Sequence, residues 1–537
     1  MSVAVRTAGA LLLLALGPAC APAMKGAVLP DATLQALQGS RDAFLAGPVQ
    51  AMHPVRTFED RDFAYAAALS PDGTRIAWVH LGGDGFRLAV ADVERHGEDR
   101  ADVLLNPVEF DVEGLAFTPD GTHLVTAGRD GALRLSAAGD ATLVQVALAE
   151  RPLVSLAVHP SGTWLAAGDD VGGLHFYSLP ELQPLGSAAV HTDEVRGVAF
   201  AVDGRLVSGS WDRSVAVHGT RVQTGPVREV LVQAQQGGEV PALWAHLNGR
   251  SRLLLGVDGR LPISVLTGEA ARAGGIDPAA LTGTRELPTA LGVQLAKVAP
   301  AQQLAFRELP LVMDVAICDA CVPKGVQGVL AAPFLEGVAL RFENGGALAR
   351  LSLREHLEAP PVPRVELTPL ARHSLKHHVN AVALDAAGTR LAVALSETPA
   401  KRTREIYQRE KDGVIEPQAP GNVARVVSLD AGEVIFETTG HRGVVSAVAL
   451  SPDGETLASG GWDKRVRLHT RGEGEVGGWS AGWSIRQLRF SRDGRRLVAA
   501  AWTPVKATGN QRSDPAVQLF LLDYRTPVVH TRVATGP

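Results

Sequence analysis

The stretch SPDGETLASGGWDKRVRLH (residues 451–469) is nearly repeated by VDGRLVSGSWDRSVAVH (residues 202–218). Each copy has a D-G turn, a short apolar run, the motif S-G-x-W-D, a basic residue and an alternating segment that ends in His. A single catalytic site has no need of a second copy of itself, whereas a fold made of repeating units does. The repetition therefore predicts a repeat architecture.

Turn signals of the type S/T-P-D-G recur along the chain, each between two alternating strands. Glycine takes the positive φ that closes a tight hairpin, and period-2 runs on either side bury one face of each strand. Four of the six intervals between the closing glycines (48, 41, 42 and 40 residues) are close to the length of a four-stranded propeller blade. We therefore expect seven blades, closed by Gly73, Gly121, Gly162, Gly204, Gly388, Gly454 and Gly494.

This pattern resembles the WD40 family, whose repeats carry G-H, then S-P-D-G, then S-G-x-x-D, over residues 52–235 and 372–537. The resemblance implies a buried structural hydrogen-bond network in two blades, with His218 and His469 in place of the usual strand-end Trp. A catalytic triad is the alternative, but the set recurs at the repeat period and no oxyanion motif accompanies it. The network residues are His191, Ser208 and Asp212 in one blade and His441, Ser459 and Asp463 in the other.

The long interval before Gly388 contains an insert, residues 236–371, whose sequence does not have the pattern of a propeller blade. Its segments 240–275, 306–317 and 325–353 resemble the bacterial retropepsin-like aspartyl protease domain. Asp258 falls at the catalytic position, but Gly259 and Arg260 follow it where that family has Thr or Ser and then Gly.

Aspartic peptidases need two carboxylates that share a proton, and retropepsin-like domains supply one each in a dimer. Arg260 is a permanent cation that would hold Asp258 ionised. We therefore expect no catalytic residue in a degenerate insert. The alternative is an active aspartic peptidase that uses Asp258 in a homodimer.

The cysteines are few. Cys318 and Cys321 form a C-x-x-C motif. It lacks the His of a haem-attachment motif, no further zinc ligands lie nearby, and a loop follows it. We therefore expect a small disulfide, with free thiols as the alternative. Cys20 lies after an apolar run at residues 8–17, in LGPAC, which resembles a lipobox. Residues 1–21 thus predict a signal peptide, cleaved either before Cys20 for lipidation or near Ala21 or Ala23.

Composition narrows the function further. The net charge of −5 and the pI of about 6.4 indicate no nucleic-acid partner, and no cofactor or metal motif is found. We expect an exported protein, in the periplasm, at the outer membrane through a lipid anchor, or secreted. Its function is then non-enzymatic, WD40-type scaffolding that binds a protein or peptide.

The expected fold is all-β: a seven-bladed WD40-like β-propeller with a small β-rich domain inserted between blades 4 and 5. Residues 22–51 read as a linker or short helix, residues 52–235 as blades 1–4 and residues 372–537 as blades 5–7. Long connections at 396–422 and 502–516 are expected on the same face as the insert, which would form the binding face. Either residues 55–60 or the tail 525–536 would complete the last blade.

Overall fold

The computed structural model describes residues 49–524 except 59–63, 83–84, 94–99, 107–111, 238–239, 290–291, 308, 344–345, 347, 356–360, 398–421, 439, 481–483 and 503–516. These residues form seven four-stranded antiparallel sheets and one ten-stranded sheet. We number the four-stranded sheets from the first to the seventh in chain order.

The first three sheets each use four consecutive strands. The first sheet contains β2 (Ala64–Leu69), β3 (Arg75–Gly82), β4 (Gly85–Asp92) and β5 (Arg100–Asn106). The second contains β6 (Val112–Phe117), β7 (His123–Gly128), β8 (Ala132–Ala137) and β9 (Leu143–Leu148). The third contains β10 (Leu153–Val158), β11 (Trp164–Asp169), β12 (Gly173–Ser178) and β13 (Pro184–Ala189).

Two of the other four sheets recruit a strand from far along the chain. The fourth contains β14 (Val195–Phe200), β15 (Leu206–Ser210), β16 (Ser214–Pro226) and β27 (Pro361–Ser374). The fifth contains β28 (His378–Leu384), β29 (Arg390–Ser396), β30 (Val423–Ser428) and β31 (Val434–Thr438). The sixth contains β32 (Val445–Leu450), β33 (Thr456–Gly461), β34 (Arg465–Thr470) and β35 (Gly474–Ser480). The seventh contains β36 (Ser484–Phe490), β37 (Arg496–Trp502), β38 (Val517–Tyr524) and β1 (Val49–Phe58).

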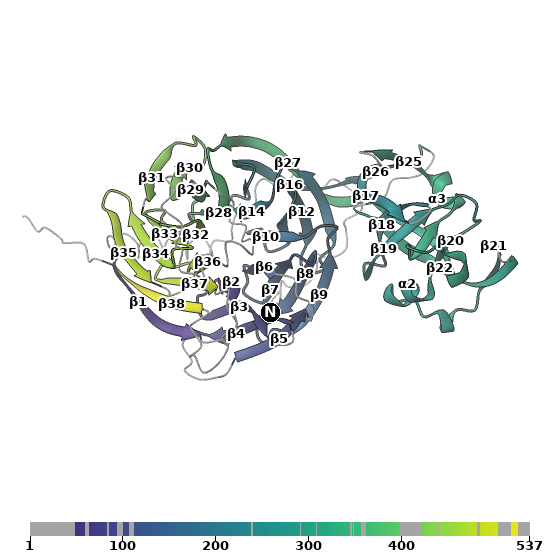
Figure 1. Ribbon diagram of the computed structural model, residues 1–537, viewed down its shortest axis with the longest axis horizontal. Helices are drawn as coiled ribbons and strands as arrows, with labels where there is room; N and C mark the ends of the chain where they lie inside the picture. Colours follow the sequence, from purple (N-terminus) through teal and green to yellow (C-terminus); the bar gives the residue numbers. More distant parts are fainter. Residues whose placement is uncertain are drawn as a thin grey trace, which may run out of the picture.

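The four-stranded sheets surround a central axis, and the architecture is an all-β propeller (Figure 1). Apolar clusters fill the spaces between neighbouring sheets, as expected for repeats that cannot bury their faces alone. The predicted propeller is confirmed. Its first strands contact one another in an unbroken cycle: β2 with β6, β6 with β10, β10 with β14, β14 with β28, β28 with β32, β32 with β36, and β36 with β2.

The hairpin between the first and second strands of a sheet is set by its turn residues. Gly73, Gly121 and Gly454 have φ of 71°, 71° and 72°, a conformation that costs residues with a side chain free energy. In the first of these turns, Asp72 accepts hydrogen bonds from Ser70 Oγ and from the backbone amide of Thr74. The turn depends only on the positive φ of its glycine and on hydrogen bonds within the turn, so it forms wherever the sequence repeats these residues.

The N-terminal strand completes the seventh sheet. β1 pairs in antiparallel register with β38, so that Met52 faces Leu522 and Thr57 faces Gln518. The competing tail, residues 525–536, lies outside the described residues.

The insert interrupts the fourth sheet rather than following it. β16 is extended well beyond its pairing with β15, and β27 returns alongside it from Pro361 to Ser374. The insert is therefore carried on a two-stranded ribbon, between the third and fourth strands of that sheet. The prediction of an insertion between blades 4 and 5 is wrong, because the segment 361–374 has no turn signal that marks it as an outer strand of the fourth sheet.

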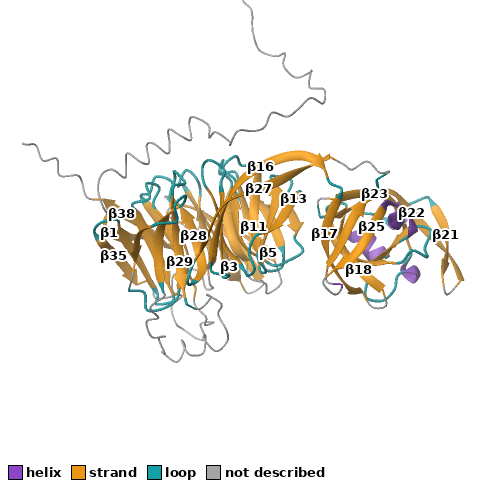
Figure 2. Ribbon diagram, turned by 90° about the horizontal axis from the view of Figure 1, so that it is seen from above, coloured by secondary structure: helices purple, strands orange, loops and turns teal. Residues whose placement is uncertain are grey.

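The prediction that the insert and the two long connections lie on one face of the propeller is also wrong. Connections in an antiparallel sheet alternate between its two ends. The segments 396–422 and 502–516 join second strands to third strands, whereas the insert joins a third strand to a fourth. The insert therefore leaves the propeller from the end where the S-P-D-G turns lie, whereas β29 and β37 end at the opposite end. Residues 398–421 and 503–516 lie outside the described residues. Figure 2 shows the β16–β27 ribbon arching over one end of the disc.

The insert's strands form the ten-stranded sheet, which runs from residue 229 to residue 353 instead of the expected 236–371, because β17 pairs with β26 and β27 belongs to the propeller. The strands are β17 (Glu229–Gly237), β18 (Val240–Leu247), β19 (Ser251–Val257), β20 (Ser264–Leu266), β21 (Thr284–Thr289), β22 (Gly292–Phe306), β23 (Leu309–Ile317), β24 (Gly328–Leu330), β25 (Val338–Glu343) and β26 (Leu348–Leu353). Its short helices are α2 (Gly268–Ala273), α3 (Ala332–Gly337), η1 (Pro278–Ala280) and η2 (Asp319–Cys321).

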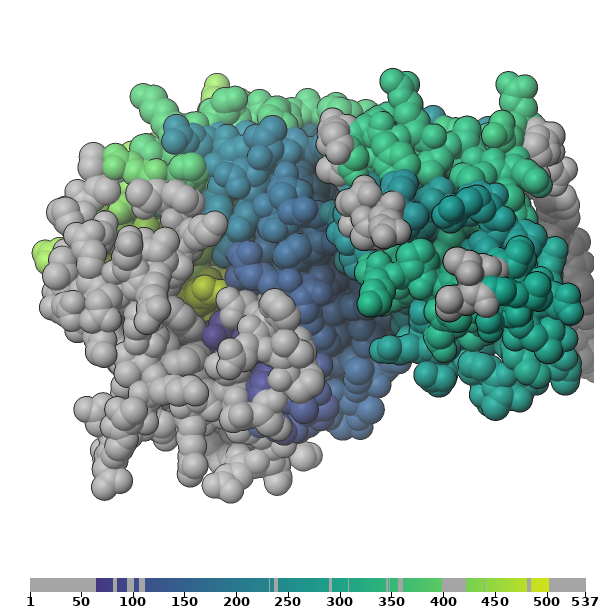
Figure 3. All heavy atoms as spheres, turned by 45° about the vertical axis from the view of Figure 1, so that its right-hand side comes forward, coloured from purple at the N-terminus to yellow at the C-terminus, as the bar shows by residue number. Residues whose placement is uncertain are grey.

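The insert has its own hydrophobic core and also contacts the rim of the propeller (Figure 3). Arg307 Nη2 lies 3.0 Å from Glu150 Oε2, and Arg307 Nη1 donates to Ser187 Oγ at 2.8 Å. His246 Nε2 lies 2.8 Å from the carbonyl oxygen of Leu148. These contacts join the insert to the edges of the second and third sheets, so the ribbon is not its only attachment.

Candidate functional site

Two His–Ser–Asp sets lie where the repeats place them. In the fourth sheet, His191 Nε2 is 2.8 Å from Ser208 Oγ and His191 Nδ1 is 3.0 Å from Asp212 Oδ2. Ser208 lies on β15, whereas His191 and Asp212 lie in the loops before β14 and after β15. Ser208 is fully buried, so no substrate can reach its hydroxyl.

The sixth sheet repeats this geometry. His441 Nε2 is 2.8 Å from Ser459 Oγ, and His441 Nδ1 is 3.1 Å from both carboxylate oxygens of Asp463. Burial opposes the charge of Asp463, but hydrogen bonds from His441 and from backbone amides outweigh it and lower its pKa. The ionised carboxylate thus orients the imidazole toward a buried hydroxyl.

The position where the WD40 pattern has Trp is occupied by His218 and His469, both buried. Within the described part of the chain, the Nδ1 atom of each ring has no hydrogen-bond partner. Burial lowers the pKa of His469 to about 4, and it lowers the pKa of His218 as well. The two rings therefore pack as neutral groups and do not extend the network.

A charged cluster, which the sequence reasoning missed, crosses the central channel. Glu113 on β6 contacts Arg129 at 3.0 Å, Arg196 of β14 at 3.2 Å and Arg486 of β36 at 3.2 Å. Glu194 contacts Arg129 at 3.1 Å. Burial disfavours the charge of Glu113, but the surrounding guanidinium groups hold its pKa well below its usual range. The cluster links the second, fourth and seventh sheets across the axis.

In the insert, β19 ends immediately before Asp258, whose backbone amide donates to the carbonyl of Leu330 at 3.0 Å. The carboxylate is held by Arg260 of the same turn, with Nε at 2.8 Å from Oδ1 and Nη2 at 2.5 Å from Oδ2. These hydrogen bonds lower the pKa of Asp258. In this conformation the carboxylate is therefore ionised and paired within its own turn.

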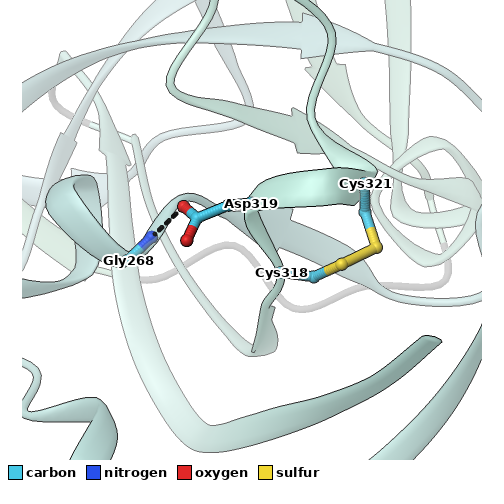
Figure 4. The surroundings of a disulfide bond; sticks show 4 residues. All are labelled: Gly268, Cys318, Asp319 and Cys321. Carbon is cyan, nitrogen blue, oxygen red and sulfur yellow. Dashed lines mark hydrogen bonds between the residues drawn. A yellow bond between two sulfur atoms is a disulfide. The ribbon is translucent and has the colours of Figure 1, made fainter.

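Cys318 and Cys321 are joined by a disulfide at the short helix η2 (Figure 4). Between them, Asp319 Oδ1 accepts a hydrogen bond of 2.8 Å from the backbone amide of Gly268 at the start of α2. The disulfide therefore closes the loop on itself, and the hydrogen bond of Asp319 fixes the loop to the start of α2. Cys20, the predicted lipidation residue, lies outside the described residues.

The comparisons agree with the repeats. The family model described as WD domain, G-beta repeat matches residues 107–135, 182–218 and 432–470. Proteins named eukaryotic translation initiation factor 3 subunit I from Scheffersomyces stipitis, Lodderomyces elongisporus and Candida albicans are 33%, 32% and 31% identical to this chain over 100 residues. Each match covers 18% of this chain and 28% of the relative. The chain thus contains WD40 repeats within an all-β propeller.

These relatives correct the predicted location. The sequence predicted export to the periplasm, the outer membrane or the medium, whereas the similar proteins are named for translation initiation, which points away from an exported or periplasmic location. Residues 1–21, on which the expectation rested, lie outside the described residues. Among the residues that the structure describes, no helix is long and apolar enough to cross a membrane.

The replacement Ser459→Ala tests the buried network. It removes the hydroxyl beside His441 Nε2 and leaves a buried ring nitrogen without its partner, so the free energy of unfolding should fall by about 1–3 kcal/mol in urea denaturation. Ser208→Ala should behave alike. Ser374→Ala, at an exposed position of β27, is the matched control and should change stability by less than about 0.5 kcal/mol. Equal effects of all three would contradict the network.

Proposed function

We propose that the protein is a non-enzymatic WD40-type scaffold that presents a degenerate aspartyl-protease-like domain to a protein or peptide partner. In this proposal the seven four-stranded sheets are seven blades of one closed propeller, and the His–Ser–Asp sets hold its loops rather than catalyse. The unbroken cycle of contacts between first strands supports the closed ring. The observation that carries the non-enzymatic assignment is the pairing of Asp258 with Arg260.

The order of elements in the insert supports its assignment to a protease-like fold. β18 carries the V-P strand, Asn248 and Gly249 close the hairpin with φ of 51° and 65°, and β19 runs into Asp258. The second half begins with β24, parallel to β19, followed by α3 and by the β25–β26 hairpin. The segments follow one another in the same order as in the retropepsin-like pattern, and this order is what supports the proposed assignment.

The way in which the insert is attached to the propeller supports the proposal that it is presented to a partner. Its attachment includes a ribbon and the contacts of Arg307, His246 and Arg252 with the propeller rim. A cavity of about 320 Å³ lies between the two parts, lined by Tyr177 and Pro184 of the third sheet and by Pro310 of the insert, among others. A partner that binds in this cavity would therefore contact the insert together with the second and third sheets.

A pull-down that compares the whole chain with a chain lacking the insert tests this function. Gly225 and Val362 face each other across the ribbon, so an Asn-Gly turn between them replaces residues 226–361 with a hairpin. The whole chain and its Asp258→Asn variant should both retain a protein that the shortened chain loses. Identical sets of retained proteins from all three chains would contradict a presenting role for the insert.

The second candidate is an aspartic peptidase that pairs Asp258 across a homodimer. A shallow, largely open depression lined by Gly259, Leu335 and Glu336, among others, lies beside the same turn and favours this possibility. Because Arg260 stabilises the ionised carboxylate, we expect no pepstatin-sensitive cleavage of peptides at acid pH. Cleavage that pepstatin inhibits, and that Asp258→Asn abolishes, would establish the peptidase and overturn the non-enzymatic assignment.

A further inference from the structure

At one position on the inner strands of the propeller, the seventh sheet has a different type of residue from the other six sheets. In every sheet the first strand pairs with the second strand, and these residue pairs align the seven first strands with one another. We call the residue in the second-to-last pair before the S-P-D-G turn the fifth common position. The seventh sheet has Arg489 at this position. The other six sheets have alanine, at Ala68, Ala116, Ala157, Ala199, Ala383 and Ala449.

These positions line a wide chamber of about 1110 Å³ at the end of the central channel where the S-P-D-G turns lie. The chamber wall is mostly apolar, with Phe117, Phe200 and Phe490 among its residues. Arg492 also lines it, at the turn position that Pro71 occupies in the first sheet. Both substitutions by arginine occur in the seventh repeat.

Arg489 and Arg492 are the only cations among the described residues that line this chamber. Arg489 donates one hydrogen bond, from Nη1 to the carbonyl of Leu488 at 3.0 Å, and no ion pair with a described carboxylate accompanies it. Burial lowers its pKa to about 10 and also lowers the pKa of Arg492. Since an unpaired cation in such surroundings loses hydration free energy, an anion in the chamber would recover part of it.

The carboxylates that line the chamber do not pair with Arg489. Asp120 accepts hydrogen bonds from the side chains of Thr118 and Thr122 within its own turn. Asp385 accepts from the backbone amide and the side chain of Thr389, again within its turn. Both carboxylates are therefore engaged at the mouth, whereas the six alanines leave space beside Arg489.

We propose that this chamber is a carboxylate-binding site in which Arg489, assisted by Arg492, binds the carboxylate of a ligand that enters from the S-P-D-G end. The apolar wall receives the remainder of the ligand. The site belongs to the propeller alone and does not depend on any role of the insert. The carboxylate can belong to a free small acid or to an acidic side chain of a peptide, and the two sources are separated by the probes below.

Isothermal titration calorimetry on the whole chain tests the site with three probes. They are glutarate, a pentapeptide blocked at both ends with a central glutamate between alanines, and the same peptide with glutamine. Because hydrogen bonds to charged groups contribute about 1.5–3 kcal/mol, at least one acidic probe should bind about tenfold or more tightly than the glutamine peptide. Tighter binding of the glutamate peptide than of glutarate indicates a peptide ligand, and the reverse indicates a free acid.

Arg489→Ala should weaken the binding of the acidic probe about tenfold or more, whereas Arg495→Ala, at an exposed position after the same turn, should leave it within about twofold. Arg489→Ala restores the residue that six sheets already have and removes a half-buried charge that pairs with no described carboxylate, so the melting temperature should not fall. Absence of binding by both acidic probes, or unchanged binding to Arg489→Ala, would overturn the proposal.

Discussion

Antiparallel pairing of β1 with β38 is the constraint on which the rest of the molecule depends. It brings residues 49–58 to the outer edge of a sheet whose other three strands come from residues 484–524. Radial repetition protects strand edges only when the ring is complete. Without this strand, β38 of the seventh sheet would keep β37 as its inner partner but would lose its outer one. The same sheet supplies Arg486 and Arg489 to the channel.

The ring in turn determines what the channel can do. Small residues at the fifth common position let the first strands approach the axis and leave a chamber between them. At a second level of the channel, Glu113 compensates arginines from three parts of the chain. Arg489 lies next to both levels and lines both cavities. The channel thus has one level where Glu113 and Glu194 partly compensate three arginines, and one where Arg489 and Arg492 line a mostly apolar wall.

Repetition made the propeller predictable from sequence. The turn glycines, the alternating strands and the His–Ser–Asp sets each depend on local chemistry that recurs, and the structure places them accordingly. The topology of the insert was not predictable in the same way, because the extended pairing of β16 with residues 361–374 has no counterpart in the other repeats. The Glu113 cluster depends on contacts between residues up to 373 positions apart, which no local pattern encodes. Arg489 is visible in the sequence, but only after the seven first strands are aligned.

Ring closure is tested most directly by removing β1 alone. A chain that starts at residue 47 keeps this strand, and a chain that starts at residue 60 lacks it. If β1 closes the ring, the shorter chain should melt at least about 5 °C lower and the amides of β38 should exchange with deuterium much faster than in the longer chain. Equal melting temperatures and equal protection of β38 in the two chains would contradict a propeller closed by its N-terminal strand.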